Sequence, residues 1–132
     1  MIIEEKEFNI CLKHVLKPVL KKYGIDIQEC HIDIKDKIYV TGVVQYQDTT
    51  FGIKGCCDID YHDDCLCFEH IEGKIHYLFF HLDIVDVLKQ FVKSSYIRID
   101  DNACYIHYPL PIQSITSSLQ QLNIVFKSTS FS

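Results

Sequence analysis

The stretch that decides the fold runs from Ile38 to Ile59 and reads IYVTGVVQYQDTTFGIKGCCDI. A polar turn at 47–49 divides it, and on both sides of that turn apolar or small residues recur at every second position. This period of two is typical of β-strands that bury one face. The residues that share this face are Ile38, Val40, Gly42, Val44 and Tyr46 before the turn, and Phe51, Ile53, Gly55, Cys57 and Ile59 after it. The stretch therefore predicts two long antiparallel strands.

The neighbouring segments extend this pair into a larger sheet. Before it, Cys30, Ile32 and Ile34 alternate with polar residues up to a turn at 36–37. After it, residues 65–71 predict a fourth strand that ends in a turn at 72–73. Four strands joined by short polar turns indicate an antiparallel meander with one apolar face. Residues 75–82 are apolar on both faces and predict a buried strand or connector.

Three helices and a hairpin are predicted around the meander. Residues 4–23 have helical spacing, with a kink at Pro18 and a C-terminal cap at Gly24. Residues 83–93 predict a second helix capped by Asp83, and 97–100 with 103–108 predict a hairpin. The three- and four-residue steps across 112–122 predict a third helix, followed by a short strand or tail at 123–132. The apolar stripe of the first helix comprises Phe8, Cys11, Leu12, Val15, Leu16, Val19, Leu20 and Tyr23.

These elements predict the α+β class. An N-terminal helix packs on a curved antiparallel meander sheet, and a second helix, a hairpin and a C-terminal helix follow. The length of 132 residues suits one domain that spans 1–132.

Composition narrows the classes of function. The chain is 48% hydrophobic with a net charge of −5, which argues against disorder and against nucleic acid as the main partner. No apolar run is long enough to span a bilayer. The acidic start, with Glu4, Glu5 and Glu7, does not resemble a secretory signal. Seven cysteines without an export signal favour free thiols in the reducing cytoplasm.

The segment 56–67 carries the densest set of metal-ligand residue types. Cys57, His62, Cys65 and Cys67 could converge around zinc where two strands meet. The spacing lacks the two-residue gap of a zinc knuckle, so we expect thiols packed as small apolar side chains and neither a metal nor another cofactor.

Enzymatic chemistry is also not expected. The chain has no glycine-rich phosphate loop and no serine in a strained elbow. Cys104 and His107 point to opposite faces of their strand. The adjacent pair Cys30 and His31 does the same.

The sheet has more apolar residues than one buried face requires, and this excess suggests a function. Apolar residues also occupy the strand positions opposite the main apolar face, among them Val43, Cys56 and Leu66. Such a surplus predicts either a curved sheet that encloses a groove for a hydrophobic small molecule or lipid, or an apolar sheet face that pairs two copies of the chain. The residues expected to line the groove are Leu16, Val40, Val44, Phe51, Ile53, Phe68, Leu78, Phe80 and Phe91.

The order of elements resembles a known superfamily. The succession 38–44, 51–55 and 67–75, then a helix at 83–93 and the strand pair 96–100 and 103–108, resembles small bacterial members of the tubular lipid-binding (TULIP) superfamily. This resemblance covers roughly residues 4–108. It implies long meander strands that wrap a helix and enclose acyl chains. It implies no role for any single residue.

Overall fold

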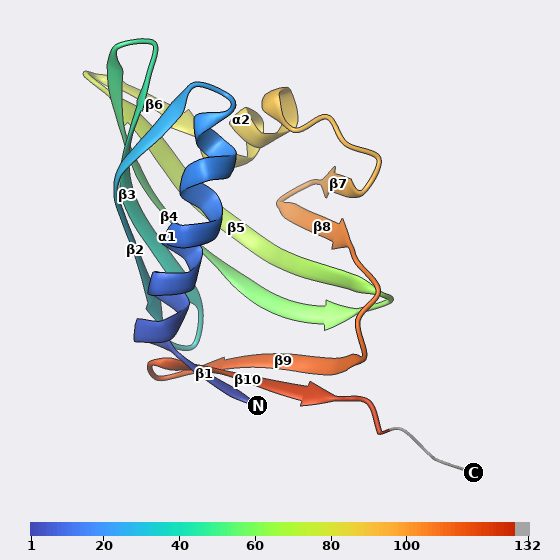
Figure 1. Ribbon diagram of the computed structural model, residues 1–132. Helices are drawn as coiled ribbons and strands as arrows, with labels where there is room; N and C mark the ends of the chain where they lie inside the picture. The colour runs from blue at the N-terminus through green and yellow to red at the C-terminus, as the bar shows by residue number, and fades with distance from the viewer. Residues whose placement is uncertain (129–132) are drawn as a thin grey trace.

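The computed structural model describes residues 1–128, and its elements are mostly β, with 59% in strands and 20% helical. Figure 1 shows a strongly curved sheet with both helices on its hollow side. The helices are α1 (Glu5–Lys21) and α2 (Ile84–Phe91). The strands are β1 (Ile2–Glu4), β2 (Ile25–Ile34), β3 (Ile38–Tyr46), β4 (Thr49–His62), β5 (Cys65–Tyr77), β6 (Phe80–Asp83), β7 (Ile97–Asp100), β8 (Ala103–His107), β9 (Ile112–Ser118) and β10 (Gln121–Phe126).

The large sheet has seven antiparallel strands, in the order β2-β3-β4-β5-β8-β7, with β6 also paired to β5. Strands β2 to β5 form the meander that the alternation predicts. Two-residue turns at 47–48 and 63–64 join its long strands, and all four turn residues have positive φ. This is the geometry of a type I′ turn, whose twist matches that of the strands it joins.

Two β-bulges keep the apolar residues on one face. In β5, Glu69 pairs with Asp58 while Glu72 pairs with Cys56, so β5 holds one more residue than β4 over this interval. His70 lies there with φ of 51°. A similar extra residue lies in β2, between Ile27 and Glu29. An extra residue reverses the side to which all later side chains point.

The strand register corrects part of the predicted second apolar face: Val43 and Cys56 do lie opposite the main apolar set, whereas residues of β5 and β6 do not. Leu66 and Phe68 pair with Ile106 and Cys104 of β8 and lie on the same side as the main apolar set, as do Tyr77 and Phe80 of β5 and β6. The predicted turn at 72–73 is also absent, because β5 runs unbroken through it. Residues 75–82 form the exposed end of the β5–β6 hairpin instead of a buried segment.

The predicted third helix is wrong. Residues 112–118 and 121–126 form the hairpin β9–β10, and β1 completes a three-stranded sheet in the order β1-β10-β9. A register shift next to Ile112 places both Ile112 and Ile115 in the core, which imitates helical spacing. The serines and the threonine of 112–118 are also poor helix formers. The sequence predicts a short strand or a tail at 123–132; residues 123–126 belong to strand β10, and residues 129–132 lie outside the described residues.

The predicted α+β class, with a C-terminal helix, is therefore wrong, and the chain is mostly β with two helices and two sheets. The first two helices do occur near their predicted positions. The side chain of Asp83 caps α2 by accepting from the backbone N–H of Val85 and Asp86. Gly24, with φ of +78°, follows α1 as predicted. Pro18 lies within α1, which continues past it to Lys21.

Helix α1 is fixed to the edge strand β2 by side chain to backbone hydrogen bonds. The amide of Asn9 donates to the carbonyl of Ile32 at 2.8 Å and accepts from its N–H at 2.7 Å. The carboxylate of Glu5 accepts from the N–H of Ile34 at 2.7 Å. These bonds identify the flank of the helix that faces β2.

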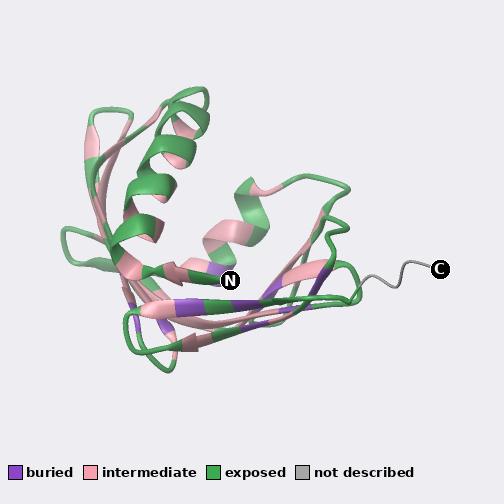
Figure 2. Cartoon of the chain, turned by 60° about the horizontal axis from the view of Figure 1, so that its bottom comes forward, coloured by how far each residue is buried: buried purple, intermediate pink, exposed green. Residues whose placement is uncertain are grey.

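The closely packed core occupies only one end of the molecule. Figure 2 shows most of the buried residues where the three-stranded sheet meets the large sheet, while α1 is mostly exposed and has no buried residue. The accessible surface is 9323 Å², against about 7,200 Å² for a compact monomer of this mass. The members of this core are Ile32, Ile34, Ile38, Tyr61, Ile112, Ile115, Leu122 and Ile124. The rest of the curved sheet is therefore open.

Candidate functional site

The inner face of the large sheet, meaning the face toward α1 and α2, carries no charged side chain between residues 25 and 107. Strand register assigns its residues, and most are only half-buried. They include Val40, Val44, Phe51, Ile53, Cys57, Ile59, Leu66, Phe68, Ile75, Ile97, Ile99, Cys104 and Ile106. A face of this composition offers apolar contact and few hydrogen bonds to a ligand.

Helix α1 covers only part of this face. Phe8 and Leu12 pack against the core. Val15 and Val19 belong to the same apolar side of the helix, yet 62% and 46% of their surface is exposed. At about 100° per residue, Cys11 and Val15 lie on the flank away from Asn9 and therefore away from β2, whereas Val19 lies between these two flanks, on the side of the helix that faces the sheet. They face the open part of the inner face.

Helix α2 covers a second part. The Cδ1 atom of Ile84 lies over Gly55 and Gly73, where an added Cβ would come within 2.8 Å and 2.5 Å of it. Glycine at both positions lets the helix approach the sheet. On its other side, α2 and β6 enclose a recess of about 510 Å³ with a mixed lining that includes Lys74, His81 and Phe91.

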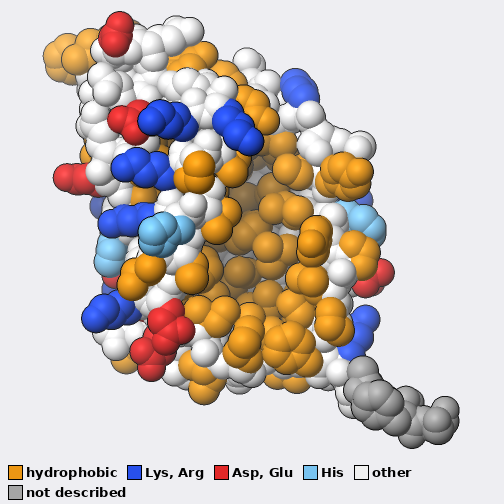
Figure 3. All heavy atoms as spheres, viewed as in Figure 1, with side chains coloured by type: hydrophobic (Ala, Val, Ile, Leu, Met, Phe, Trp, Pro, Cys, Tyr) orange, Lys and Arg blue, Asp and Glu red, His pale blue; other side chains and the backbone are white. Residues whose placement is uncertain are grey.

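Between α1, α2 and the β7–β8 hairpin the surface is hollowed. Figure 3 shows this hollow with a floor and walls of hydrophobic side chains, and with Lys, Arg, Asp and Glu outside it. We call it the inner groove and define it by Cys11, Val15 and Val19 of α1 together with the half-buried residues of the inner face given above.

The structure places the predicted groove residues in two groups. Leu16, Val40, Val44, Phe51, Ile53 and Phe68 lie half-buried on α1 or on the inner face. Leu78, Phe80 and Phe91 lie at the β5–β6 hairpin and at the end of α2, with 75%, 64% and 69% of their surface exposed.

The predicted list omits several groove residues of the sheet, and on α1 it omits Cys11, Val15 and Val19. The sequence does contain a sign of these residues of α1. The apolar stripe of the first helix spans about 180°, whereas a helix that packs on a sheet needs a stripe of roughly 100°, so part of the stripe is left without a partner in the sheet.

Two thiols on the inner face lie in an apolar setting. Burial, and then the neighbouring Cys56, raises the pKa of Cys57 to about 11. Burial also raises the pKa of Cys104. Protonated thiols of this kind serve as small apolar side chains.

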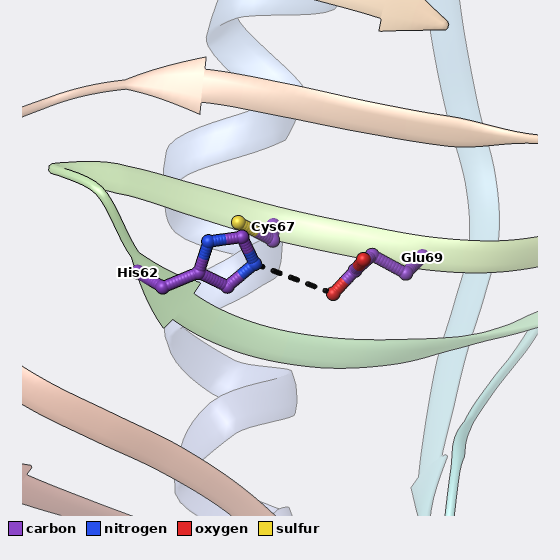
Figure 4. A group of neighbouring side chains, drawn as sticks. All are labelled: His62, Cys67 and Glu69. Carbon is purple, nitrogen blue, oxygen red and sulfur yellow. Dashed lines mark ion pairs between the residues drawn. The ribbon is translucent and has the colours of Figure 1, made fainter. Parts of the chain in front are cut away.

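The outer face is polar, and near the β4–β5 turn it holds a cluster of metal-ligand residue types. His62, Cys67 and Glu69 each present one donor atom, and these atoms lie within 4.8 Å of one another (Figure 4). Nε2 of His62 is 3.6 Å from Oε1 of Glu69. The hydrogen bond that Nδ1 of His62 donates to the carboxylate of Asp63 raises the pKa of His62, and burial raises the pKa of the Cys67 thiol.

The zinc ligands weighed from the sequence are divided by the sheet. Cys57 points to the inner face, whereas His62, Cys65 and Cys67 point outward. Glu69 was missed, although it follows Cys67 at the two-residue period that keeps it on the same face. Sequence reasoning also missed the pair formed by Cys65 and His107, which are cross-strand partners with Sγ 3.8 Å from Nδ1.

Comparisons with family models, curated proteins and solved structures give no match. In the part of the chain that the structure describes, neither helix has the length and apolarity needed to cross a membrane.

Proposed function

We propose that the chain is a non-catalytic binding module that takes an elongated apolar ligand, such as the acyl chain of a lipid, into the inner groove. The observation that carries the proposal is the exposure of Val15 and Val19 on the sheet-facing side of α1. Together with the apolar inner face these side chains form one contiguous hydrophobic surface, and large contiguous apolar patches mark binding or interaction sites on soluble proteins. The TULIP likeness, in which a curved sheet and a helix hold acyl chains, belongs to the same proposal.

Apolar burial alone is sufficient for useful affinity. A saturated chain of about 14 carbons gains roughly 11 kcal/mol when its methylenes leave water. Association costs at least about 4 kcal/mol, so a Kd in the micromolar range follows. Because the inner face lacks charges, we expect chain length to matter more than the headgroup.

The test compares two substitutions on the same helix. Val15→Asp places a carboxylate beside the groove, whereas Ile10→Asp alters a similarly exposed residue, 51% against 62%, on the opposite side of α1. Tetradecanoate binding is measured by displacement of a fluorescent fatty acid. We expect Val15→Asp to weaken binding at least tenfold and Ile10→Asp to leave it unchanged.

Two results would overturn the proposal. One is absence of tetradecanoate binding by the wild-type chain, and the other is equal weakening by both substitutions. Native mass spectrometry after gentle purification adds an independent measurement, in which a bound acyl species supports the proposal. A ligand-free dimer that Val15→Asp dissociates would favour the alternative, in which the same apolar surface pairs two copies of the chain.

A further inference from the structure

We propose that His62, Cys67 and Glu69 bind one zinc ion on the outer face of the β4–β5 hairpin, with solvent as the fourth ligand. The site lies on the face opposite to the inner groove. It is independent of the proposed function.

The donor atoms are already close to the arrangement that zinc requires. With zinc–ligand bonds of about 2.0–2.3 Å, the ligands of a tetrahedral ion lie roughly 3.3–3.8 Å from one another. The imidazole and carboxylate atoms are 3.6 Å apart, and the thiol sulfur is within 4.8 Å of both. Side-chain rotations that bring the sulfur and the other two donor atoms about an ångström closer complete the three-ligand set.

The backbone holds these positions rigidly. The type I′ turn at 63–64 fixes the register in which His62 pairs with Cys65, Asp60 with Cys67, and Asp58 with Glu69. Side chains at successive outward positions of two paired strands are neighbours, so the three donors converge without any long loop. Donors on paired strands are better positioned for a metal than donors on loops.

The second nitrogen of the imidazole is oriented as in many zinc sites. Nδ1 of His62 lies 3.3 Å from Oδ2 of Asp63. When a carboxylate accepts a hydrogen bond from Nδ1, the lone pair of Nε2 is left for the metal. Nε2 is the nitrogen that faces Glu69.

The ligand set selects the ion. Imidazole, thiolate and carboxylate together suit zinc, whereas calcium and magnesium prefer oxygen ligands only. The Cys67 thiol now donates a hydrogen bond to the carbonyl of Cys65 at 3.3 Å. On binding, a Zn–S bond replaces the S–H bond, the proton passes to solvent, and this hydrogen bond is released.

The experiment is a titration of the reduced, metal-free full chain with Zn²⁺ by calorimetry and with Co²⁺ by absorption spectroscopy. We expect one ion per chain with a Kd of about 1 μM or tighter. Co²⁺ should give the visible bands of a tetrahedral site and a thiolate-to-cobalt charge-transfer band. His62→Asn and Glu69→Gln should each weaken binding at least tenfold, and Cys67→Ala should remove the charge-transfer band.

Matched controls come from the same face. His70 and Asp58 form a neighbouring hydrogen bond at 2.7 Å outside the cluster, so His70→Asn should leave the affinity unchanged. Cys65→Ser should retain the charge-transfer band. Because Cys67 is fully buried and its loss could unfold the hairpin, the more exposed Glu69→Gln serves as the second variant. The proposal is wrong if the wild type binds no zinc, if Glu69→Gln binds as tightly as wild type, or if the band is lost in Cys65→Ser instead of Cys67→Ala.

Discussion

At the scale of single residues, Cys57 connects the apolar inner face to a measurable property. Its thiol has a reference pKa of 9.0 and a pKa of about 11 in the folded chain, chiefly because burial disfavours the thiolate. The same burial leaves the side chain among Val40, Ile59 and other apolar groups of the core margin. The pKa therefore reports how dry this part of the face is.

This shift predicts a loss of stability at high pH. Between pH 9 and 11 the unfolded chain releases the Cys57 proton while the folded chain keeps it, so ionisation favours the unfolded state. The free energy of unfolding should fall by up to about 2 kcal/mol from this group across the interval, and somewhat less because the side chain is only partly buried. Urea denaturation at pH 8.5 and 10.5 measures the loss.

The comparison variant is Cys57→Ala, which has no proton to release. Its stability should decline less than that of the wild type over the same interval, whatever its stability at pH 8.5. Cys57→Ser should behave in the same way and excludes an effect of side-chain volume. If all three proteins lose the same stability, Cys57 ionises at a similar pH in the folded and unfolded chains, and the inner face is wetter than its burial indicates.

At the scale of elements, the bulge at His70 decides which side chains line the groove. Deleting His70 would leave β5 without its extra residue, so Ile75 and Tyr77, which follow the bulge, would point outward or the pairing with β4 would slip. We expect this deletion to abolish cooperative unfolding, as followed by circular dichroism. His70→Gly should keep the fold and remain within about 1 kcal/mol of wild type, since glycine adopts positive φ without strain. A cooperatively folded deletion variant would contradict the assigned register.

The same bulge explains the limits of sequence reasoning. Alternation located β3 and β4 correctly, because each keeps an unbroken period of two with a polar turn between them. It failed at β5, where the extra residue reversed the parity and suggested a second apolar face. It failed again at β9, where a register shift gave Ile112 and Ile115 helical spacing. A bulge depends on the partner strand, so a single segment contains little sign of it.

The residues of the candidate sites also differ in how far they can be predicted from the sequence. Inner-face residues such as Val40 and Ile53 follow from alternation alone. The position of Glu69 beside His62 depends on how the β4–β5 hairpin folds back, which requires the turn type and the register together. Exposure of Val15 depends on how far the sheet curves away from α1, and this is a property of several strands at once.

At the scale of the whole molecule, the proposed ligand should stabilise the folded chain, because it binds a groove that only the folded chain forms. A ligand that binds only the folded state stabilises it by about 2.7 kcal/mol when its free concentration is 100 times its Kd. We therefore expect tetradecanoate to raise the unfolding midpoint of the wild type and of Ile10→Asp, and to leave that of Val15→Asp unchanged. Differential scanning fluorimetry at several ligand concentrations measures this effect.

The dependence on concentration separates the two possible occupants of the groove. For a bound acyl chain, the midpoint rises with ligand concentration and is unaffected by a tenfold dilution of the protein at fixed free ligand. For a second copy of the chain, the midpoint falls on dilution without any ligand, because dissociation precedes unfolding. If the midpoint changes neither with ligand concentration nor with protein concentration, the inner face binds neither an acyl chain nor a second copy of the chain. Any partner that binds only the folded state must shift the midpoint.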